Sequence, residues 1–163
     1  MAGDDGRGAR GTACVGLLVG RWLLDGGFPA AVPLREGWEI GERTEPGECE
    51  RIGRALAARS ARVALLVMGD GTARRGVKAP GYLDERAVPF DDEVARALGG
   101  VDTRALAAID PAAASDLMAA GRAPWQVLAG AVDGSSPSWR GELLSYRAPY
   151  GVGYFTAVWT PQG

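Results

Sequence analysis

The N-terminal part of the chain carries apolar residues at helical spacing. Val15, Leu18 and Trp22 fall at positions i, i+3 and i+7 of one helix face. Further leucines widen this stripe, so we expect a helix over about residues 12–24, buried on most of its circumference and ended by Asp25–Gly27. Residues 1–11 are Gly-rich and charged, and are predicted to be disordered.

A second helix is expected from Thr44 onward. Thr44 is a favourable N-cap residue, and Pro46 suits the first turn of a helix. Cys49, Ile52 and Leu56 then recur on one face. The pattern predicts that this face turns toward the core while the arginines of the helix face solvent.

The most apolar stretch runs from Arg62 to Met68 and stops at Gly69-Asp70-Gly71. A continuous apolar run without alternation is typical of a strand buried on both faces at the centre of a parallel sheet. A short strand is also expected around Trp38–Ile40. A helix, a buried strand and a Gly-rich loop in succession indicate a layered α/β fold.

The C-terminal half is predicted to contain short helices followed by two strands. Helices are expected from about residues 90, 103 and 111 and over 124–131, with Asp110 as the N-cap before Pro111. Alternating apolar residues predict strands over about 141–146 and 152–159, joined by a turn at 148–151.

Composition and charge remove several classes of function. The chain has 163 residues, of which 47% are hydrophobic and 23% charged, as in a folded domain. Its net charge of −2 argues against binding to nucleic acid or to an anionic membrane. The absence of histidine removes Ser-His-Asp and Cys-His catalysis and histidine-ligated metal sites within this chain.

The two cysteines indicate a reducing compartment. Cys14 and Cys49 lie far apart without a CxxC motif, and each falls on the apolar side of a predicted helix. Buried reduced thiols, and hence a cytoplasmic protein, are therefore expected. The apolar run 13–20 is interrupted by Arg21, and it is too short to span a bilayer.

The loop after the apolar run is the first candidate site, because ligands gather at the carboxyl ends of strands in open α/β sheets. It combines a carboxylate, a hydroxyl and several cations, which suit a small anionic or aromatic ligand. The alternative is a turn in which Asp70 caps its own backbone and the arginines face solvent. The candidate pocket residues are Asp70, Thr72, Arg74, Arg75, Lys78, Tyr82, Asp84, Glu85 and Tyr150.

Other conspicuous residues have structural interpretations. Asp91, Asp92 and Glu93 are expected in the first turn of a helix, where negative charge is stabilised by the helix dipole. Trp125 is expected to anchor the core, and Tyr154 either lines a pocket or packs in its strand.

Four blocks of the chain resemble a known group of bacterial proteins. They are LLVMGDGTARR (65–75), KAPGYLDERAVPFD (78–91), GRAPWQVLAGA (121–131) and APYGVGYFTAVW (148–159). They are similar to uncharacterised proteins with a LigB-like domain of the class III extradiol ring-cleavage dioxygenase type, over residues 13–159. The resemblance implies a three-layer α/β/α sandwich with a mixed, partly parallel sheet, formed by residues 12–160 as a single domain.

The resemblance also implies chemistry that this chain lacks. The wider superfamily binds non-haem Fe(II) through two His and a Glu and cleaves catechols with dioxygen. A strand there ends in Gly-Asp-Leu-Ser-His, whereas the corresponding Gly69–Ala73 keeps a hydroxyl at Thr72 but has Ala73 in place of the histidine. The third ligand is unassigned, with Glu142 one candidate. An N-terminal strand and helix of the longer relatives are expected to be missing.

Three hypotheses remain open. The first is a catalytically degenerate domain, without catalytic residues, metal ligands or cofactor, that binds a small molecule or a partner. The alternative is a non-haem iron oxidoreductase whose ligands come from a longer N-terminus or a partner chain, and the third is a fragment without function. A domain lacking its first strand is also expected to expose a sheet edge and to self-associate into a homo-oligomer.

Overall fold

The computed structural model describes residues 15–27, 36–132 and 138–162. The chain divides into two compact units, Met1–Glu39 and Ile40–Gly163. Residues 1–11 and Cys14, on which expectations were placed, lie outside the described residues.

The described part of the first unit is dominated by one helix, α1 (Val15–Gly27). The helix is where the sequence predicts it, but the prediction that it is buried is wrong. Val15 and Trp22 are 75% and 70% exposed. Within this unit the other described residues are 36–39, of which Gly37 lies against the Leu17 side chain. Trp38–Ile40 forms no strand.

The second unit begins with α2 (Pro46–Ala57). Its inner face is the predicted one, since Cys49 is fully buried in a cluster with Ala123 and Val127, and Ile52 and Leu56 pack against it. The N-cap is Glu45 rather than Thr44, and its side chain makes no capping hydrogen bond. Pro46 occupies the first turn, as expected.

The remaining elements confirm most of the predicted helices and both C-terminal strands. Asp110 caps α5 by accepting hydrogen bonds from the Ala112 and Ala113 amides, as expected of an Asp-Pro helix start. The elements are α3 (Ala87–Gly100), α4 (Thr103–Ala107), α5 (Pro111–Asp116), α6 (Arg122–Val132), β1 (Trp139–Arg147), the short 3-10 turn η1 (Pro149–Gly151) and β2 (Tyr154–Pro161).

β1 and β2 pair as an antiparallel hairpin, with Trp139 opposite Pro161 and Arg147 opposite Tyr154. The register shifts between Leu143 and Ser145, as at a β-bulge. Burial alternates along both strands, so one face of the hairpin is covered and the other is open to solvent.

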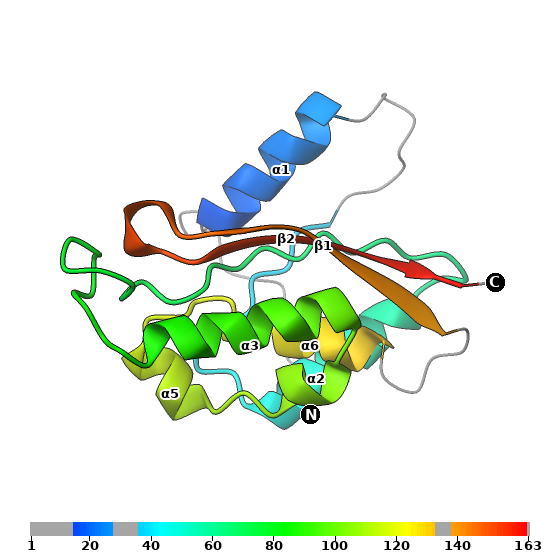
Figure 1. Ribbon diagram of the computed structural model, residues 1–163. Helices are drawn as coiled ribbons and strands as arrows, with labels where there is room; N and C mark the ends of the chain where they lie inside the picture. The colour runs from blue at the N-terminus through cyan, green and yellow to red at the C-terminus, as the bar shows by residue number, and fades with distance from the viewer. Residues whose placement is uncertain (1–14, 28–35, 133–137, 163) are drawn as a thin grey trace, which may run out of the picture. The chain divides into compact units, whose positions relative to one another are not determined.

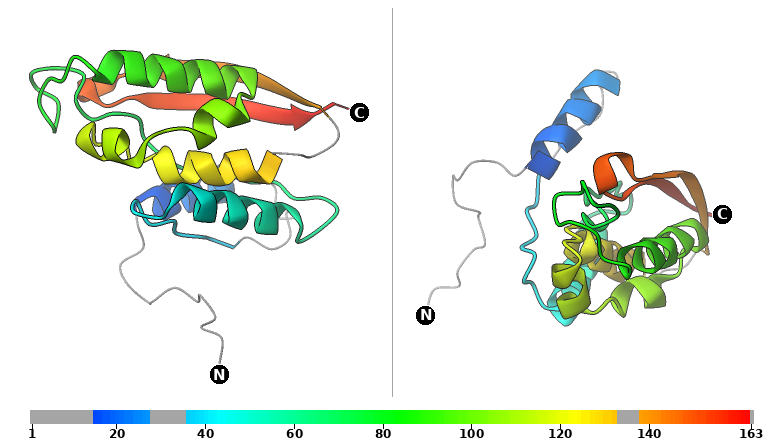
Figure 2. Two further views of the ribbon diagram at one scale, coloured as in Figure 1. Left: turned by 90° about the horizontal axis from the view of Figure 1, so that it is seen from below. Right: turned by 60° about the vertical axis from the view of Figure 1, so that its left-hand side comes forward.

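α3 lies against the covered face of the hairpin, and α6 packs between α4 and α2 (Figure 1). Figure 2 shows the hairpin with α3, then α6, then α2 as successive layers. The main core joins Val94 and Leu98 of α3 to Leu106 and to Trp125 of α6. Trp125 is 3% exposed, and its ring packs edge-on against Phe155 with 5.7 Å between the ring centroids. It is therefore the core anchor that the sequence predicts.

The three-layer α/β/α sandwich with a mixed, partly parallel sheet is wrong for this chain. The only sheet of the described residues is the β1–β2 hairpin. Residues 63–70 form neither helix nor strand, and Val63 and Leu66 are 41% and 49% exposed. The apolar run predicts a central strand, but a central strand needs a hydrogen-bonded neighbour on each side, and the described residues form none beside it.

None of the described helices is both long enough and apolar enough to cross a membrane.

Candidate functional site

The predicted site loop, residues 68–78, is held against the hairpin turn by backbone hydrogen bonds. The Gly71 amide donates to the Gly153 carbonyl at 2.7 Å, and the Gly153 amide donates to the Thr72 carbonyl at 2.9 Å. The Arg75 amide donates to the Gly151 carbonyl at 3.1 Å. The loop that carries most of the candidate residues and the turn that carries Tyr150 are therefore adjacent, at one end of the hairpin.

Asp91 of α3 anchors this junction. It is fully buried, and its carboxylate accepts the Thr72 amide and the Thr72 hydroxyl, each at 2.9 Å. Burial raises the pKa of Asp91, while the hydrogen bonds from Thr72 act in the opposite direction. The carboxylate fits only because Gly71 and Gly153 have no side chains, since a Cβ would stand 2.7 Å and 2.3 Å from its oxygens.

Arg75 extends this network toward the hairpin. Its guanidinium lies 3.5 Å from the Asp91 carboxylate and donates to the Tyr146 hydroxyl at 2.7 Å. Tyr146 in turn donates to Asp92 at 2.7 Å and stacks on Phe155. Burial and the hydrogen bond to Asp92 raise the pKa of Tyr146. Thr72 and Arg75 thus have partners inside the protein.

A second group of candidates faces outward, which we call the outer loop surface: Arg74, Tyr82 and Tyr150. Tyr82 and Tyr150 are 64% and 92% exposed, and both adopt positive φ, 61° and 58°. Their loops meet at Ala79, whose carbonyl accepts the Tyr82 amide and whose side chain lies against Gly151. Positive φ is uncommon for bulky residues and often occurs at binding sites.

Arg74 occupies the base of the outer loop surface. Its stem lies against Gly81, and its guanidinium is 4.0 Å from Asp84. The Arg74 Nε is buried, and among the described residues it has no hydrogen-bond partner. A buried donor without an acceptor is rare in folded proteins, and it marks a place where an additional acceptor would be favourable.

Asp84 is engaged mainly with Arg86. The Arg86 guanidinium donates to the Asp84 carboxylate at 2.8 and 3.1 Å, and these bonds lower the pKa of Asp84 to about 2. The other three candidates, Asp70, Lys78 and Glu85, are exposed and form no side-chain hydrogen bond or ion pair with described residues. Partial burial of the Asp70 carboxyl raises its pKa.

The residues present do not fit the iron site that the resemblance implies. The chain has no histidine. Ala73 is buried and Glu142 is exposed on the open face of β1. In the described ranges, no three Cys, Asp or Glu side chains come together as metal ligands would. Cys49 is a buried free thiol, and burial raises its pKa.

Sequence reasoning missed the role of Asp91. It placed Asp91 in the first turn of a helix, but α3 begins at Ala87, so Asp91 lies one turn further in. A signal was present: Val94, Ala95 and Leu98 follow Asp91 at i+3, i+4 and i+7, which puts the carboxylate on the apolar stripe. A buried carboxylate needs hydrogen-bonding partners, and Thr72 is the only serine or threonine of the predicted loop.

A buried polar pair in α6 was also missed. Arg122 is 3% exposed and donates to the carbonyls of Thr44 and Glu42 and, at 3.0 Å, to Gln126. Gln126 donates to the carbonyls of Ala107 and Ile109 at 3.1 and 3.0 Å. These bonds join α6 to two loops, which gives Arg122 a structural function.

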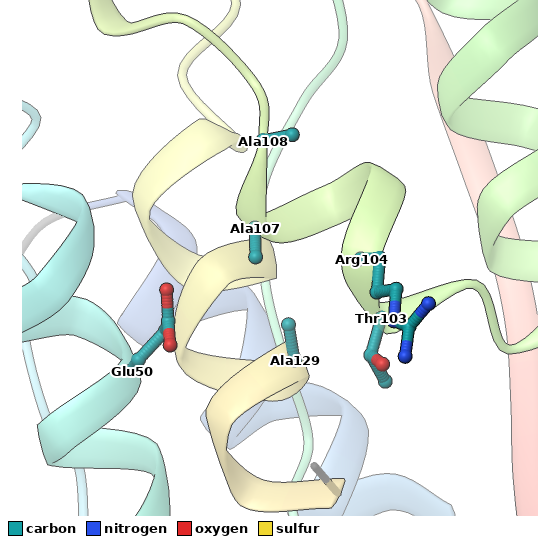
Figure 3. A pocket seen from close by; sticks show the side chains of 6 residues that line it. All are labelled: Glu50, Thr103, Arg104, Ala107, Ala108 and Ala129. Atoms are coloured by element: carbon teal, nitrogen blue, oxygen red, sulfur yellow. The ribbon is translucent and has the colours of Figure 1, made fainter.

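The larger cavity lies away from the predicted site. It has a volume of about 520 Å³ and opens between α2, α4 and α6, where Glu50 and Arg104 lie on opposite sides of Ala107 and Ala129 (Figure 3). Its lining residues are Glu50, Thr103, Arg104, Ala107, Ala108 and Ala129. A smaller hollow of about 160 Å³ lies on the open face of the hairpin, between Arg140, Glu142, Val158 and Thr160.

In comparisons with known proteins, no family model, no curated protein and no solved structure matches the chain.

Proposed function

We propose that this chain is a catalytically degenerate domain of the LigB-like dioxygenase type, and that it binds a small anionic aromatic molecule on the outer loop surface. The observation that carries the proposal is Arg74, whose side chain is partly exposed and whose buried Nε has no partner among described residues, in the same loop as the exposed Tyr82. A ligand carboxylate would pair with the partly exposed guanidinium of this arginine.

The chemistry of the three side chains fits a carboxylate attached to a ring. A guanidinium presents a planar fork of N–H groups that matches a carboxylate. Tyr82 and Tyr150 are exposed, so their ring faces are open to stacking by an aromatic ligand, and both residues have positive φ. Asp84 is neutralised by Arg86, so the nearby carboxylate repels an anion less strongly.

Binding without ring cleavage agrees with the residues at the Gly69–Ala73 turn. Alanine cannot transfer a proton, and an iron site made of two His and a Glu cannot form from a chain with no histidine. The Thr72 hydroxyl, which the resemblance aligns with a family serine, is committed to Asp91. The residues of this turn therefore support positioning of the loop rather than chemistry.

Titration with 4-hydroxybenzoate, followed by amide chemical shifts in ¹⁵N-labelled protein, tests the proposal. We expect saturable shifts centred on Arg74, Tyr82 and Tyr150 at concentrations up to about 10 mM, the range of weak small-ligand affinities. The neutral analogue 4-hydroxybenzyl alcohol is expected to bind more weakly, because it lacks the carboxylate. Arg74→Gln is expected to weaken binding of the acid by about tenfold.

Two controls decide the outcome. Arg104→Gln changes an arginine outside the outer loop surface, and should leave the affinity unchanged. Absence of saturable shifts, or shifts unaffected by Arg74→Gln, would overturn the proposal. So would catechol-dependent oxygen uptake by the purified protein with stoichiometric iron, which would favour the oxidoreductase alternative.

A further inference from the structure

Residues 62–68, the apolar run predicted as a central strand, expose apolar side chains on the surface of the second unit. Among the described residues, no backbone hydrogen bond involves residues 63–69, and the first bond beyond them is from the Gly121 amide to the Asp70 carbonyl at 2.7 Å. Val63, Leu65 and Leu66 are 41%, 39% and 49% exposed. Every residue from 63 to 68 is apolar. The segment therefore combines unpaired backbone groups with exposed apolar side chains, the two features that favour pairing with another chain.

We propose that the segment 62–70 is a self-recognition edge, at which a second copy of this chain docks as an antiparallel strand. The register is centred on Leu66, so that each Leu66 faces its counterpart and Arg62 of one copy faces Asp70 of the other. The segment contains none of the three residues of the outer loop surface.

Charge complementarity selects this occupant and this register. Arg62 and Asp70 are the only charged residues of the segment and stand at its two ends, four positions on either side of Leu66. Both are exposed, and neither forms an ion pair with a described residue. Antiparallel pairing about Leu66 brings them together twice, once at each end of the paired strands, whereas a parallel in-register pair would place like charges together.

The side-chain alternation of a strand agrees with the same register. Val67 packs against the main core, whereas Leu66 is 49% exposed. If the segment pairs as an extended strand, Arg62 and Asp70 share the face of Leu66. Residues directly opposite in an antiparallel pair share a face. The ion pairs and the Leu66 contact would therefore lie together on the outer face. Residues 63–69, between the two charges, include no charged residue and no proline that would oppose strand pairing.

Sedimentation velocity of the full chain tests the proposal. The concentrations run from about 5 to 500 µM, which covers the dissociation constants of weak interfaces. We expect a reversible monomer–dimer equilibrium. Leu66→Glu, which places two carboxylates on the symmetry axis, should leave only monomer. Arg62→Asp and Asp70→Arg should each weaken the dimer by about tenfold or more, because each places like charges opposite one another. The double variant Arg62→Asp/Asp70→Arg should restore dimerisation.

Crosslinking gives a second readout that tolerates a variant with reduced stability. Leu66→Cys is expected to form an intermolecular disulfide, since facing residues of an antiparallel pair lie within disulfide reach. Leu144→Cys, at an equally exposed position on the hairpin (55%), is the matched control and should not crosslink. A monomer across the whole range, or a dimer that survives both single charge reversals, would overturn the proposal. Failure of 4-hydroxybenzoate binding would leave it intact.

Discussion

At the scale of single residues, the most informative side chain is Asp91. It is fully buried. Its carboxylate accepts two hydrogen bonds from Thr72 and lies 3.5 Å from the Arg75 guanidinium. A charged group taken out of water is tolerated only when its hydrogen-bonding capacity is met. Asp91 therefore joins three parts of the second unit: α3, the site loop and, through Arg75 and Tyr146, the hairpin.

Asp91→Ala is expected to lower the free energy of unfolding by about 2–4 kcal/mol, because it leaves the Thr72 amide and hydroxyl buried without an acceptor. Glu93→Ala, an exposed carboxylate two residues away in the same helix, is the control and should cost no more than about 0.5–1 kcal/mol. Urea unfolding measures both. Equal losses would mean that Asp91 acts only through the helix dipole.

The sequence nominates the candidate residues as a set, but it does not show which of them are held inside the protein. A glycine-rich loop after an apolar run, carrying Arg74 and Arg75, was enough to nominate a site. Which arginine faces inward depends on Asp91 and Tyr146, 16 and 71 positions away from Arg75 in the chain. Such long-range pairings leave no local pattern, so the sequence could not separate Arg75, which is held inside, from Arg74.

At the scale of elements, the sequence predicted those helices and strands whose signals lie within a few neighbouring residues. The Asp110–Pro111 helix start and the alternation of 152–159 are properties of a few neighbouring residues, and both correspond to elements of the structure. The run 62–68 was predicted wrongly because a strand depends on partners elsewhere in the chain. The apolar composition of this run favours burial, but it does not show whether neighbouring strands exist to pair with it.

The crossing of α2 and α6 depends on two glycines. A Cβ on Gly53 would stand 2.0 Å from the Val127 carbonyl oxygen, and one on Gly130 would stand 2.3 Å from the Glu50 carbonyl oxygen. Each helix thus presents a glycine to the backbone of the other. Because the obstructing atoms are main chain, they cannot move aside as a flexible side chain would, and the two helices would have to separate.

Gly53→Ala is therefore expected to destabilise the protein by about 1–3 kcal/mol, the usual cost of overpacking. Gly47→Ala in the same helix is the matched control, because a Cβ there meets nothing within 4 Å. It should be neutral or stabilise by up to about 1 kcal/mol through better helix propensity. Thermal unfolding of the two variants compares them directly. If Gly53→Ala behaved like Gly47→Ala, the close crossing would be wrong.

At the scale of the whole molecule, the buried apolar residues are concentrated in the second unit. Both hydrophobic clusters, the Asp91 network and the Arg122–Gln126 bonds lie within Ile40–Gly163. Cooperative folding requires a continuous core whose parts stabilise one another. In this unit, Trp125 belongs to one cluster while its α6 neighbours Ala123 and Val127 belong to the other, so α6 links the two.

The second unit, residues 40–163, is accordingly expected to fold when expressed by itself. Its urea unfolding should be a single transition that coincides by tryptophan fluorescence and by far-ultraviolet circular dichroism. Leu106→Ala, at a fully buried position, should lower the free energy of unfolding by about 2–5 kcal/mol, and equally in this unit and in the full chain. A gradual transition, or a Leu106→Ala effect confined to the full chain, would show that residues 40–163 do not contain a complete core. A sharp transition would also argue against a non-functional fragment, because an incomplete core would not unfold cooperatively.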